Sequence, residues 1–290
     1  MPLKILNQID DAIAAAYNPE DDFRNHFGIS GIGKSCQRAN WFSYRWVTLP
    51  NHPPQLLRIF KTGHLEEPRF TRMLEAAGYR ILTVNPDSIT PTNPEGDQFR
   101  FNDKVVPVIA GSIDGIALDL LENGRKCGLE YKTMKADAFR ELCRKEVQEF
   151  RPVHYSQMQG YLFTSKGTKW ELDAFLYLVK NKDNDDLYSE FVLPDGGRQQ
   201  IDFELARETV RSEVPPDRIS SSEDWWECSQ CDHVPVCHRN APLEHKNCRN
   251  CAHGRPIVSD AESWRCLRFD MTLNRKDQLL GCNFHSGRKF

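Results

Sequence analysis

Three residues near the middle of the chain carry side chains suited to phosphodiester hydrolysis. Asp114 lies in Gly111-Ser-Ile-Asp-Gly115, and Glu130 and Lys132 follow in a Glu-Tyr-Lys tripeptide. Residues two apart on a strand point to the same face, so Tyr131 points away and leaves its carbonyl available. Carboxylate and carbonyl oxygens are the ligands of a hard divalent cation. A lysine beside them can orient an attacking water or stabilise developing phosphate charge.

The Glu-x-Lys pattern alone is equally compatible with a charged, solvent-exposed strand face. Two further features favour a site. His64 occurs early in a long helical pattern, although a histidine on a helix surface is the plain alternative. Gln157 and Tyr161 are four residues apart, so they share one face of a predicted helix.

A second group consists of cysteines. Cys228, Cys231 and Cys237 are spaced C-x2-C-x5-C, and a solitary Cys36 lies far upstream. Four thiolates can hold an iron–sulfur cluster or a zinc ion. His233 and His238 lie inside the group and leave a mixed Cys/His zinc site open.

These residues together carry a resemblance. The ordered set Gly63-His64, Asp114, Glu130-Tyr131-Lys132 and Gln157-x3-Tyr161 resembles the RecB-type branch of the PD-(D/E)xK nucleases. With the four cysteines added, the sequence is similar to the iron–sulfur exonucleases of that branch. This group includes CRISPR-associated RecB-like exonucleases, their phage relatives and the AddB nuclease domain. The resemblance covers about residues 28–240.

The resemblance implies a fold and roles for the site residues. The fold class is α/β, a restriction-endonuclease-like core with a central mixed sheet flanked by helices. His64, Asp114, Glu130 and the Tyr131 carbonyl would hold catalytic Mg²⁺ or Mn²⁺, and Lys132 would be catalytic. Gln157 and Tyr161 would support the site or contact the strand being cut.

The resemblance also implies a cofactor, a substrate and a setting. Cys36, Cys228, Cys231 and Cys237 would hold a structural 4Fe-4S cluster. The expected activity is a DNA exonuclease acting on DNA with a free or single-stranded end. The expected setting is DNA recombination, repair, or CRISPR or phage DNA processing, in the cytoplasm of a bacterium or a phage-infected host cell.

A third cysteine group lies outside the resemblance. Cys248, Cys251, Cys266 and Cys282 form the simplest zinc set, in which His285 could replace Cys282. About fifty residues cannot build a stable core alone, so a metal staple is physically sensible. We therefore predict a zinc-ribbon-like appendage that contacts DNA, docks a protein partner or simply caps the neighbouring domain.

The pattern of helices, strands and breaks divides the chain into three parts. With the resemblance, these breaks imply a nuclease core with an N-terminal helical region over residues 1–216. The cysteine segment expected to clasp Cys36 covers residues 217–240, and the expected appendage covers residues 241–290. Helices are expected at 3–16, 34–46, 56–77, 136–148, 153–165 and 199–213. Strands are expected at 79–84, 105–113, 115–121, 126–132, 170–179 and 188–193.

Composition narrows the class of protein. The 290 residues carry a formal net charge of −3, so any contact with nucleic acid must use a local basic patch. The sequence has no run of eighteen apolar residues, and residues 1–17 lack the pattern of a signal peptide, so neither a membrane span nor a leader is expected. Seven of the ten cysteines fall between residues 228 and 282, which is typical of metal binding in a reducing compartment.

Two alternatives stay open from the residues alone. One is a nucleic-acid-binding or scaffold protein with zinc sites that does not cut, and the other is a zinc-dependent binding module. A predicted helix beside Cys36, which contains Arg38, Trp41, Arg45 and Trp46, is a candidate for stacking on single-stranded DNA. The alternative is that this helix is buried in the core.

Overall fold

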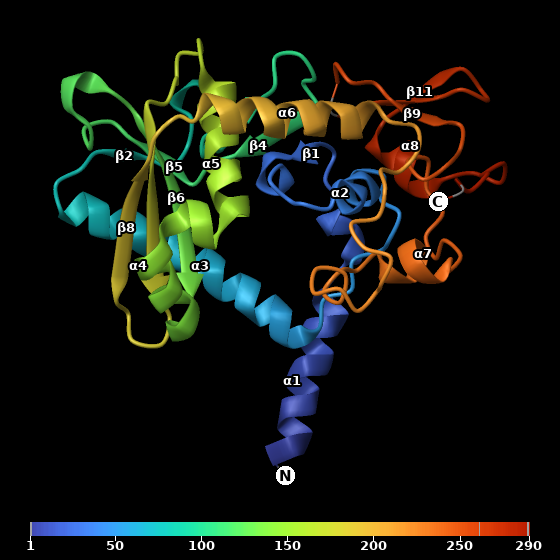
Figure 1. The fold of residues 1–290 in the computed structure, drawn as a ribbon, viewed down its shortest axis with the longest axis horizontal. Helices are drawn as coiled ribbons and strands as arrows, with labels where there is room; N and C mark the ends of the chain where they lie inside the picture. The colour runs from blue at the N-terminus through green and yellow to red at the C-terminus, as the bar shows by residue number, and fades with distance from the viewer. Residues whose placement is uncertain (1, 261, 289) are drawn as a thin grey trace.

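A five-stranded mixed sheet forms the centre of the fold (Figure 1). The computed structural model describes every residue except 1, 261 and 289. The strands follow the order β2 (Ile81–Leu82), β5 (Gly115–Ala117), β6 (Cys127–Met134), β7 (Ala174–Asn181) and β8 (Leu187–Val192). The β6–β7 pair is parallel, and the other neighbours are antiparallel. The predicted mixed sheet flanked by helices is confirmed.

Two consecutive helices connect the parallel strands β6 and β7. They are α4 (Ala136–Phe150) and α5 (Pro152–Ser165). A parallel pair needs a crossover of this kind because its second strand must start again from the same end of the sheet. The chain turns between the helices at Pro152, which has no N–H and so suits the first position of α5.

Strand β7 is buried along its whole length because helices cover both faces of the sheet. Phe175 and Tyr177 belong to the cluster that contains side chains of α5. Leu176 and Leu178 pack in a second cluster with Phe70 of α3 (Pro54–Ala76). Burial on both faces explains why this strand is a continuous apolar run in the sequence. Helices α5 and α3 therefore cover opposite faces of the sheet.

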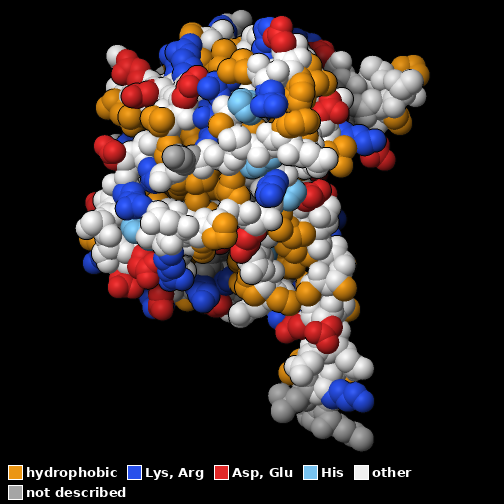
Figure 2. Space-filling model, turned by 90° about the vertical axis from the view of Figure 1, so that its right-hand side faces the viewer, with side chains coloured by type: hydrophobic (Ala, Val, Ile, Leu, Met, Phe, Trp, Pro, Cys, Tyr) orange, Lys and Arg blue, Asp and Glu red, His pale blue; other side chains and the backbone are white. Residues whose placement is uncertain are grey.

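A smaller sheet joins the N-terminal region to the core. Its order is β1 (Phe27–Gly28), β4 (Ile109–Ser112) and β3 (Arg100–Asn102), with β1 parallel and β3 antiparallel to β4. The helix α2 (Gln37–Tyr44) lies against α6 (Gly196–Arg211), which runs from the side of the central sheet to the cysteine-rich side (Figure 1). Helix α1 (Pro2–Ala16) stands out from the body and carries the exposed side chains of Ile5, Leu6 and Ile9 (Figure 2).

The remaining elements are short. They are the 3-10 turns Pro19–Asp22, Ile29–Gly31, Pro86–Ser88 and Glu122–Gly124, the helix α7 (Val234–Arg239), and the C-terminal elements β9 (Gly254–Pro256), β10 (Trp264–Cys266), β11 (Met271–Leu273) and α8 (Arg275–Leu280). Strands β9, β10 and β11 form an antiparallel sheet of their own, in the order β11-β10-β9. Within the described residues, no helix is long and apolar enough to cross a membrane.

The C-terminal elements pack firmly against the N-terminal region. Trp264 and Leu273 belong to the same buried cluster as Tyr44. Arg249 has no exposed surface, and its guanidinium lies 3.8 Å from the centre of the Trp46 ring. Its nitrogens donate to the Gln278 side chain and to backbone carbonyls, including that of Asn25 at 3.1 Å. The appendage is therefore continuous with the core.

The strand predicted over residues 105–113 is shorter in the structure, where only β4 forms. The Val106 N–H donates to the Asp103 carboxylate at 2.9 Å, and the Ile109 N–H donates to the Val106 carbonyl. Arg207 of α6 holds the same carboxylate through two hydrogen bonds of 2.8 and 2.7 Å. The side chain of Asp103 thus fixes a turn where the apolar pattern predicts extended chain.

Replacing Arg249 with alanine is expected to lower the free energy of unfolding by roughly 2–4 kcal/mol, because several buried acceptors would lose their donor. Denaturant unfolding followed by circular dichroism measures this. The matched control is Arg265→Ala in β10, where an exposed ion pair with Asp270 is lost and the change should stay below about 1 kcal/mol. Equal effects of the two substitutions would contradict the docking role of Arg249.

Candidate active site and cysteine clusters

Antiparallel pairing of β5 with β6 brings Asp114 beside the Glu-Tyr-Lys tripeptide. Asp114 occupies the short link between β4 and β5, and Gly115 pairs with Leu129. The Tyr131 N–H donates to the Asp114 carboxylate at 2.7 Å. Tyr131 itself turns its ring to the opposite face, where it stacks on Phe70 at 4.9 Å. The strand thus separates Tyr131 from its two charged neighbours, as its two-residue period predicts.

Glu130 is the most deeply buried charged group of the site, with 1% of its surface exposed. The Gln157 side-chain amide donates to both of its carboxylate oxygens, at 2.9 and 2.8 Å, and Lys132 donates to one of them. Burial, reinforced by the charge of Asp114, raises the pKa of Glu130 to about 7, although Lys132 acts in the opposite direction. Burial likewise raises the pKa of Asp114, against the influence of Lys132.

Lys132 lies between these two carboxylates. Its ammonium also donates to the Tyr131 carbonyl at 3.2 Å. Burial would lower the pKa of Lys132, but the charges of Glu130 and Asp114 outweigh burial and raise it. The site thus combines two acidic groups, one backbone carbonyl and a charged lysine in one cluster at β6. This is a donor set for a hard cation beside a positive charge for a phosphate.

Gln157 and Tyr161 lie on the face of α5 that covers these groups. The Tyr161 hydroxyl donates to the Ser112 carbonyl at 2.7 Å, two residues before Asp114. Gly111 makes this approach possible, because a Cβ at that position would lie 2.6 Å from the hydroxyl oxygen. Tyr161 is buried, so its position favours support of the Asp114 loop over contact with a substrate.

His64 lies at the rim of the cleft. Its side chain is 72% exposed, and its Nδ1 is 3.2 Å from a carboxylate oxygen of Glu67. No hydrogen bond joins His64 to Asp114 or Glu130 in the described part of the chain. A positive charge on His64 would nevertheless lower the pKa of Asp114. The structure therefore places His64 next to the other predicted ligands without drawing it into their hydrogen bonds.

Three residues of this region were not predicted from the sequence. Glu67 follows His64 by one helical turn; burial and then the charge of Asp114 raise its pKa, so it faces the same cleft. Tyr177 lies opposite Glu130 in the β6–β7 register, and its hydroxyl is 2.7 Å from Nδ1 of His154. For Glu67, the sequence offered one signal: it follows His64 by three residues, so the two share one face of the predicted helix. The His154–Tyr177 pair depends on tertiary packing alone.

The cysteines predicted to clasp the two ends of the nuclease core are close together. Cys36 precedes α2, and the Ser35 hydroxyl donates to the Glu227 carboxylate. Burial raises the pKa of Cys228, and the neighbouring Cys36 and Cys237 raise it further. A tight turn joins Cys228 to Cys231, whose N–H donates to the Cys228 carbonyl at 2.9 Å. None of these four cysteines forms a disulfide bond.

His233 has other partners. Its Nε2 is 2.9 Å from the Ser43 hydroxyl, and its Nδ1 is 2.9 Å from the Thr48 hydroxyl. Burial, followed by the charge of Lys34, lowers the pKa of His233 to about 4. With both ring nitrogens engaged, His233 is a poor candidate for the fourth ligand, and this favours Cys36.

The four cysteines of the appendage line one small cavity: Cys248, Cys251, Cys266 and Cys282. Burial raises the pKa of Cys248 to about 12, with Cys282, Cys251 and Cys266 as further causes. His285 is not among the residues that line this cavity, and its Nε2 is 2.8 Å from the Asn250 side chain. The arrangement favours Cys282 over His285.

Proximity does not yet amount to coordination geometry. Within the residues that the structure describes, no three His, Cys, Asp or Glu side chains are already arranged as a metal-binding group. The soft sulfur donors of both cysteine groups suit zinc or iron, and the oxygen donors around Glu130 suit magnesium or manganese.

The aromatic helix beside Cys36 belongs to the core. Trp41, Arg45 and Trp46 have no exposed surface, and the Trp41 indole donates to the Ser212 carbonyl at 3.0 Å. These side chains are therefore not available for stacking on bases, and the alternative of a buried helix holds.

Comparison with known proteins gives distant similarities in structure alone. No protein-family model and no curated protein matches the sequence. The crystal structure of SSO0001 is similar with 14% identity, covering 83% of this chain and 97% of that one, at a TM-score of 0.45. The crystal structure of LHK-Exo in complex with dAMP is similar with 12% identity. The match covers 66% of this chain and 90% of that one, at a TM-score of 0.46. A second structure, of the alkaline exonuclease LHK-Exo from Laribacter hongkongensis, also has 12% identity. The match covers 69% of this chain and 90% of that one, at a TM-score of 0.43. Similarities this distant assign neither a family nor an activity.

Replacing Gly111 with alanine is expected to lower the free energy of unfolding by about 1–3 kcal/mol, because the new methyl group would collide with Tyr161. Tyr161→Phe removes the nearest atom, so the double variant should be more stable than the sum of the single changes predicts. Gly63→Ala is the control: no atom lies within 4 Å of its added Cβ, so an alanine at this helical position should be neutral or stabilising. Strict additivity of the two substitutions in denaturant unfolding would refute the contact.

Proposed function

We propose that the protein is a metal-dependent deoxyribonuclease that hydrolyses phosphodiester bonds, acting as an exonuclease on DNA. The observation that carries the proposal is the assembly of Asp114, Glu130 and Lys132 around strand β6, with the amide of Gln157 on the Glu130 carboxylate. Chance occurrences of these residue types in a sequence would not be expected to converge in space. Exonuclease mode and DNA as the substrate rest on the sequence resemblance.

Each residue has a role that its contacts support. Asp114, Glu130 and the Tyr131 carbonyl would hold Mg²⁺ or Mn²⁺, with His64 and Glu67 at the rim. The ion, when bound, supplies Lewis-acid activation of the phosphate and of a water molecule. Lys132 is held in place by Glu130 and stays charged, so it can stabilise the negative charge that develops on the phosphate. Gln157 fixes the orientation of the Glu130 carboxylate.

The two cysteine groups are proposed to hold different metals. Cys36, Cys228, Cys231 and Cys237 would bind a 4Fe-4S cluster that ties α2 to the segment before α7. Cys248, Cys251, Cys266 and Cys282 would bind one zinc ion. Both would be structural, because each group lies where chain segments distant in sequence meet. The surface of the appendage would then be available to a protein partner.

Removing the catalytic groups should abolish cutting without unfolding the protein. Asp114→Asn, Glu130→Gln and Lys132→Met are each expected to lower the cleavage rate by roughly a hundredfold or more. End-labelled single- and double-stranded DNA, incubated with manganese or magnesium and with EDTA, provides the assay. Glu149→Gln, an exposed carboxylate at the end of α4, is the control. Full activity of the three variants, or undiminished cutting in EDTA, would refute the proposed site.

The clasp is tested by Cys36→Ala, which should remove the iron and the visible absorbance because loss of any one ligand opens the cluster. Cys143→Ala, an exposed cysteine of α4, is the matched control and should leave both unchanged. Elemental analysis of Cys36→Ala should still find about one zinc per chain, held by the appendage. Retention of iron and colour would exclude Cys36, and simultaneous loss of iron and zinc would show that the two groups form one site.

A further inference from the structure

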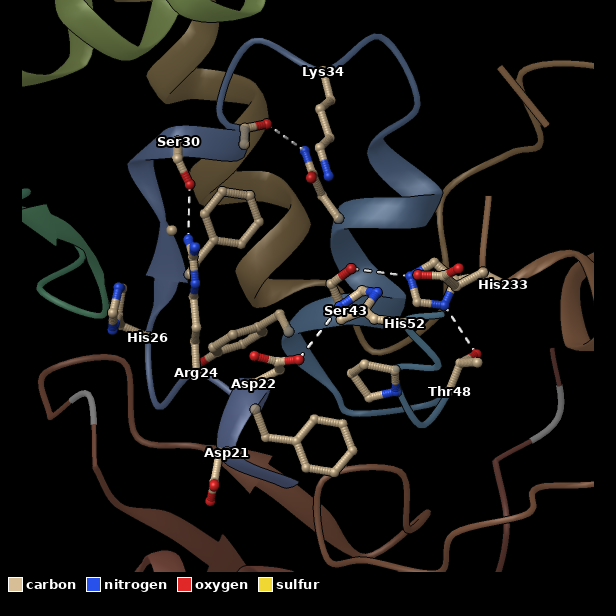
Figure 3. Close-up of a pocket in the computed structure, with 18 of the residues that line it drawn as sticks. Asp21, Asp22, Arg24, His26, Ser30, Lys34, Ser43, Thr48, His52 and His233 are labelled. Carbon is tan, nitrogen blue, oxygen red and sulfur yellow. Dashed lines mark hydrogen bonds and ion pairs between the residues drawn. The ribbon is translucent and has the colours of Figure 1, made fainter. Parts of the chain in front are cut away.

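A cavity of about 600 Å³ lies beside the candidate active site. The N-terminal loop, α2 and the start of α3 form its walls (Figure 3). It shares Phe60 and His64 with a smaller cavity that reaches Tyr131 and Lys132. The two cavities therefore adjoin each other at Phe60 and His64, and the smaller one borders Lys132.

Both cavities border one face of a helix. Phe60, His64 and Glu67 occur at intervals of four and three residues in α3, so their side chains lie in a row. Phe60 begins the row in the large cavity, and Glu67 ends it next to Lys132. A ligand lying along this row would extend from the large cavity to the catalytic groups.

Two positive side chains of the cavity have no acidic partner. Arg24 donates to the Ser30 hydroxyl at 2.7 Å, and Lys34 extends toward the cavity (Figure 3). Neither forms an ion pair among the residues that the structure describes. Gly28 allows Arg24 to lie flat against the backbone, because a Cβ there would be 2.6 Å from its guanidinium.

The positive charge extends toward the catalytic groups. Burial, then Glu130 and Asp114, raise the pKa of Tyr161, whereas the charges of Arg24 and Arg100 act against them. Burial lowers the pKa of His26 to about 4, and the next causes are Arg100 and Arg24. Arg24, which lines the cavity, thus also acts on Tyr161 of α5, whereas Arg100 is not among the residues that line the cavity.

Three acidic residues also line the cavity, and two of them have hydrogen-bond partners of their own. Asp22 accepts a hydrogen bond from the Tyr17 hydroxyl and lies 3.3 Å from Nε2 of His52. Asp21 accepts from the Asn18 amide at 3.1 Å, and Asp232 is exposed to solvent. None of these three carboxylates pairs with Arg24 or Lys34 in the described part of the chain, so both cations can meet an anion, although the carboxylates keep their own negative charge.

An aromatic surface accompanies these cations. Phe60 is 44% exposed and lines both cavities. The His52 ring meets it edge-on, with ring centres 5.2 Å apart. Stacking aromatics combined with basic side chains are how proteins hold single-stranded nucleic acid without reading its sequence.

We propose that this cavity binds the single-stranded end of the DNA substrate, with a base on Phe60 and backbone phosphates on Arg24 and Lys34. The inference rests on the proposed nuclease function and adds the place where the strand is held. The row from Phe60 to Glu67 then leads the strand toward Lys132. The preferred substrate is DNA with an unpaired end.

The test measures binding separately from cutting. Fluorescence anisotropy of a labelled single-stranded oligonucleotide is recorded with the full chain in EDTA. Phe60→Ala should weaken binding roughly 5- to 100-fold, and Phe60→Tyr, which keeps the ring, should restore it. Arg24→Gln and Lys34→Gln should each weaken binding and reduce the slope of log K against log salt by about 0.7.

Matched controls lie on other surfaces. Phe191→Ala removes an exposed aromatic of β8, and Arg265→Gln an exposed arginine of β10; neither should change binding. Unchanged affinity in the Phe60, Arg24 and Lys34 variants would overturn the inference, while loss of cutting by Asp114→Asn would leave the nuclease proposal standing. Equal losses in the control variants would also overturn it. Binding that depends on Phe60 and Arg24, in a protein that never cuts DNA, would refute the nuclease proposal alone.

Discussion

Burial of the Glu130 carboxylate is the constraint on which the catalytic cleft depends. A charge removed from water costs several kcal/mol unless it is paired and hydrogen-bonded. The fold supplies Lys132 from the same strand and Gln157 from α5. Helix α5 is in place because it belongs to the crossover between β6 and β7. The connection that makes a parallel pair possible therefore also delivers the amide that holds Glu130.

The register of β6 is fixed by the same requirement. A shift of one residue would turn Glu130 toward α3, where Phe70, Leu176 and Leu178 form an apolar cluster. The carboxylate would then be buried without a donor, while Tyr131 would lie among the polar groups of the site. Pairing with β5 on one side and β7 on the other makes that slip costly over the length of both ladders.

Regular periods explain which parts of the site could be predicted. The two-residue repeat of a strand places Glu130 and Lys132 on one face, and the helical repeat does the same for Gln157 and Tyr161. Glu67 and the His154–Tyr177 pair depend on how α3, α5 and β7 pack, which no local pattern records. The helix with Trp41 and Arg45 shows the converse, because its composition does not reveal that its aromatics face inward. Ligation of metals by the cysteines and carboxylates stays a prediction.

The N-terminal wall of the large cavity depends on residues that are translated much later. Arg249 donates a hydrogen bond to the Asn25 carbonyl, although the two residues are 224 positions apart in the sequence. Arg275 donates to the Phe23 carbonyl at 2.6 Å. At a synthesis rate of about 5–20 residues per second, loop residues 23–25 would wait roughly 11–50 seconds for these partners. A nascent chain therefore cannot complete this wall on the ribosome until its cysteine-rich region has emerged. The fold thus delays the assembly of this cavity wall until the cysteine-rich region has been made.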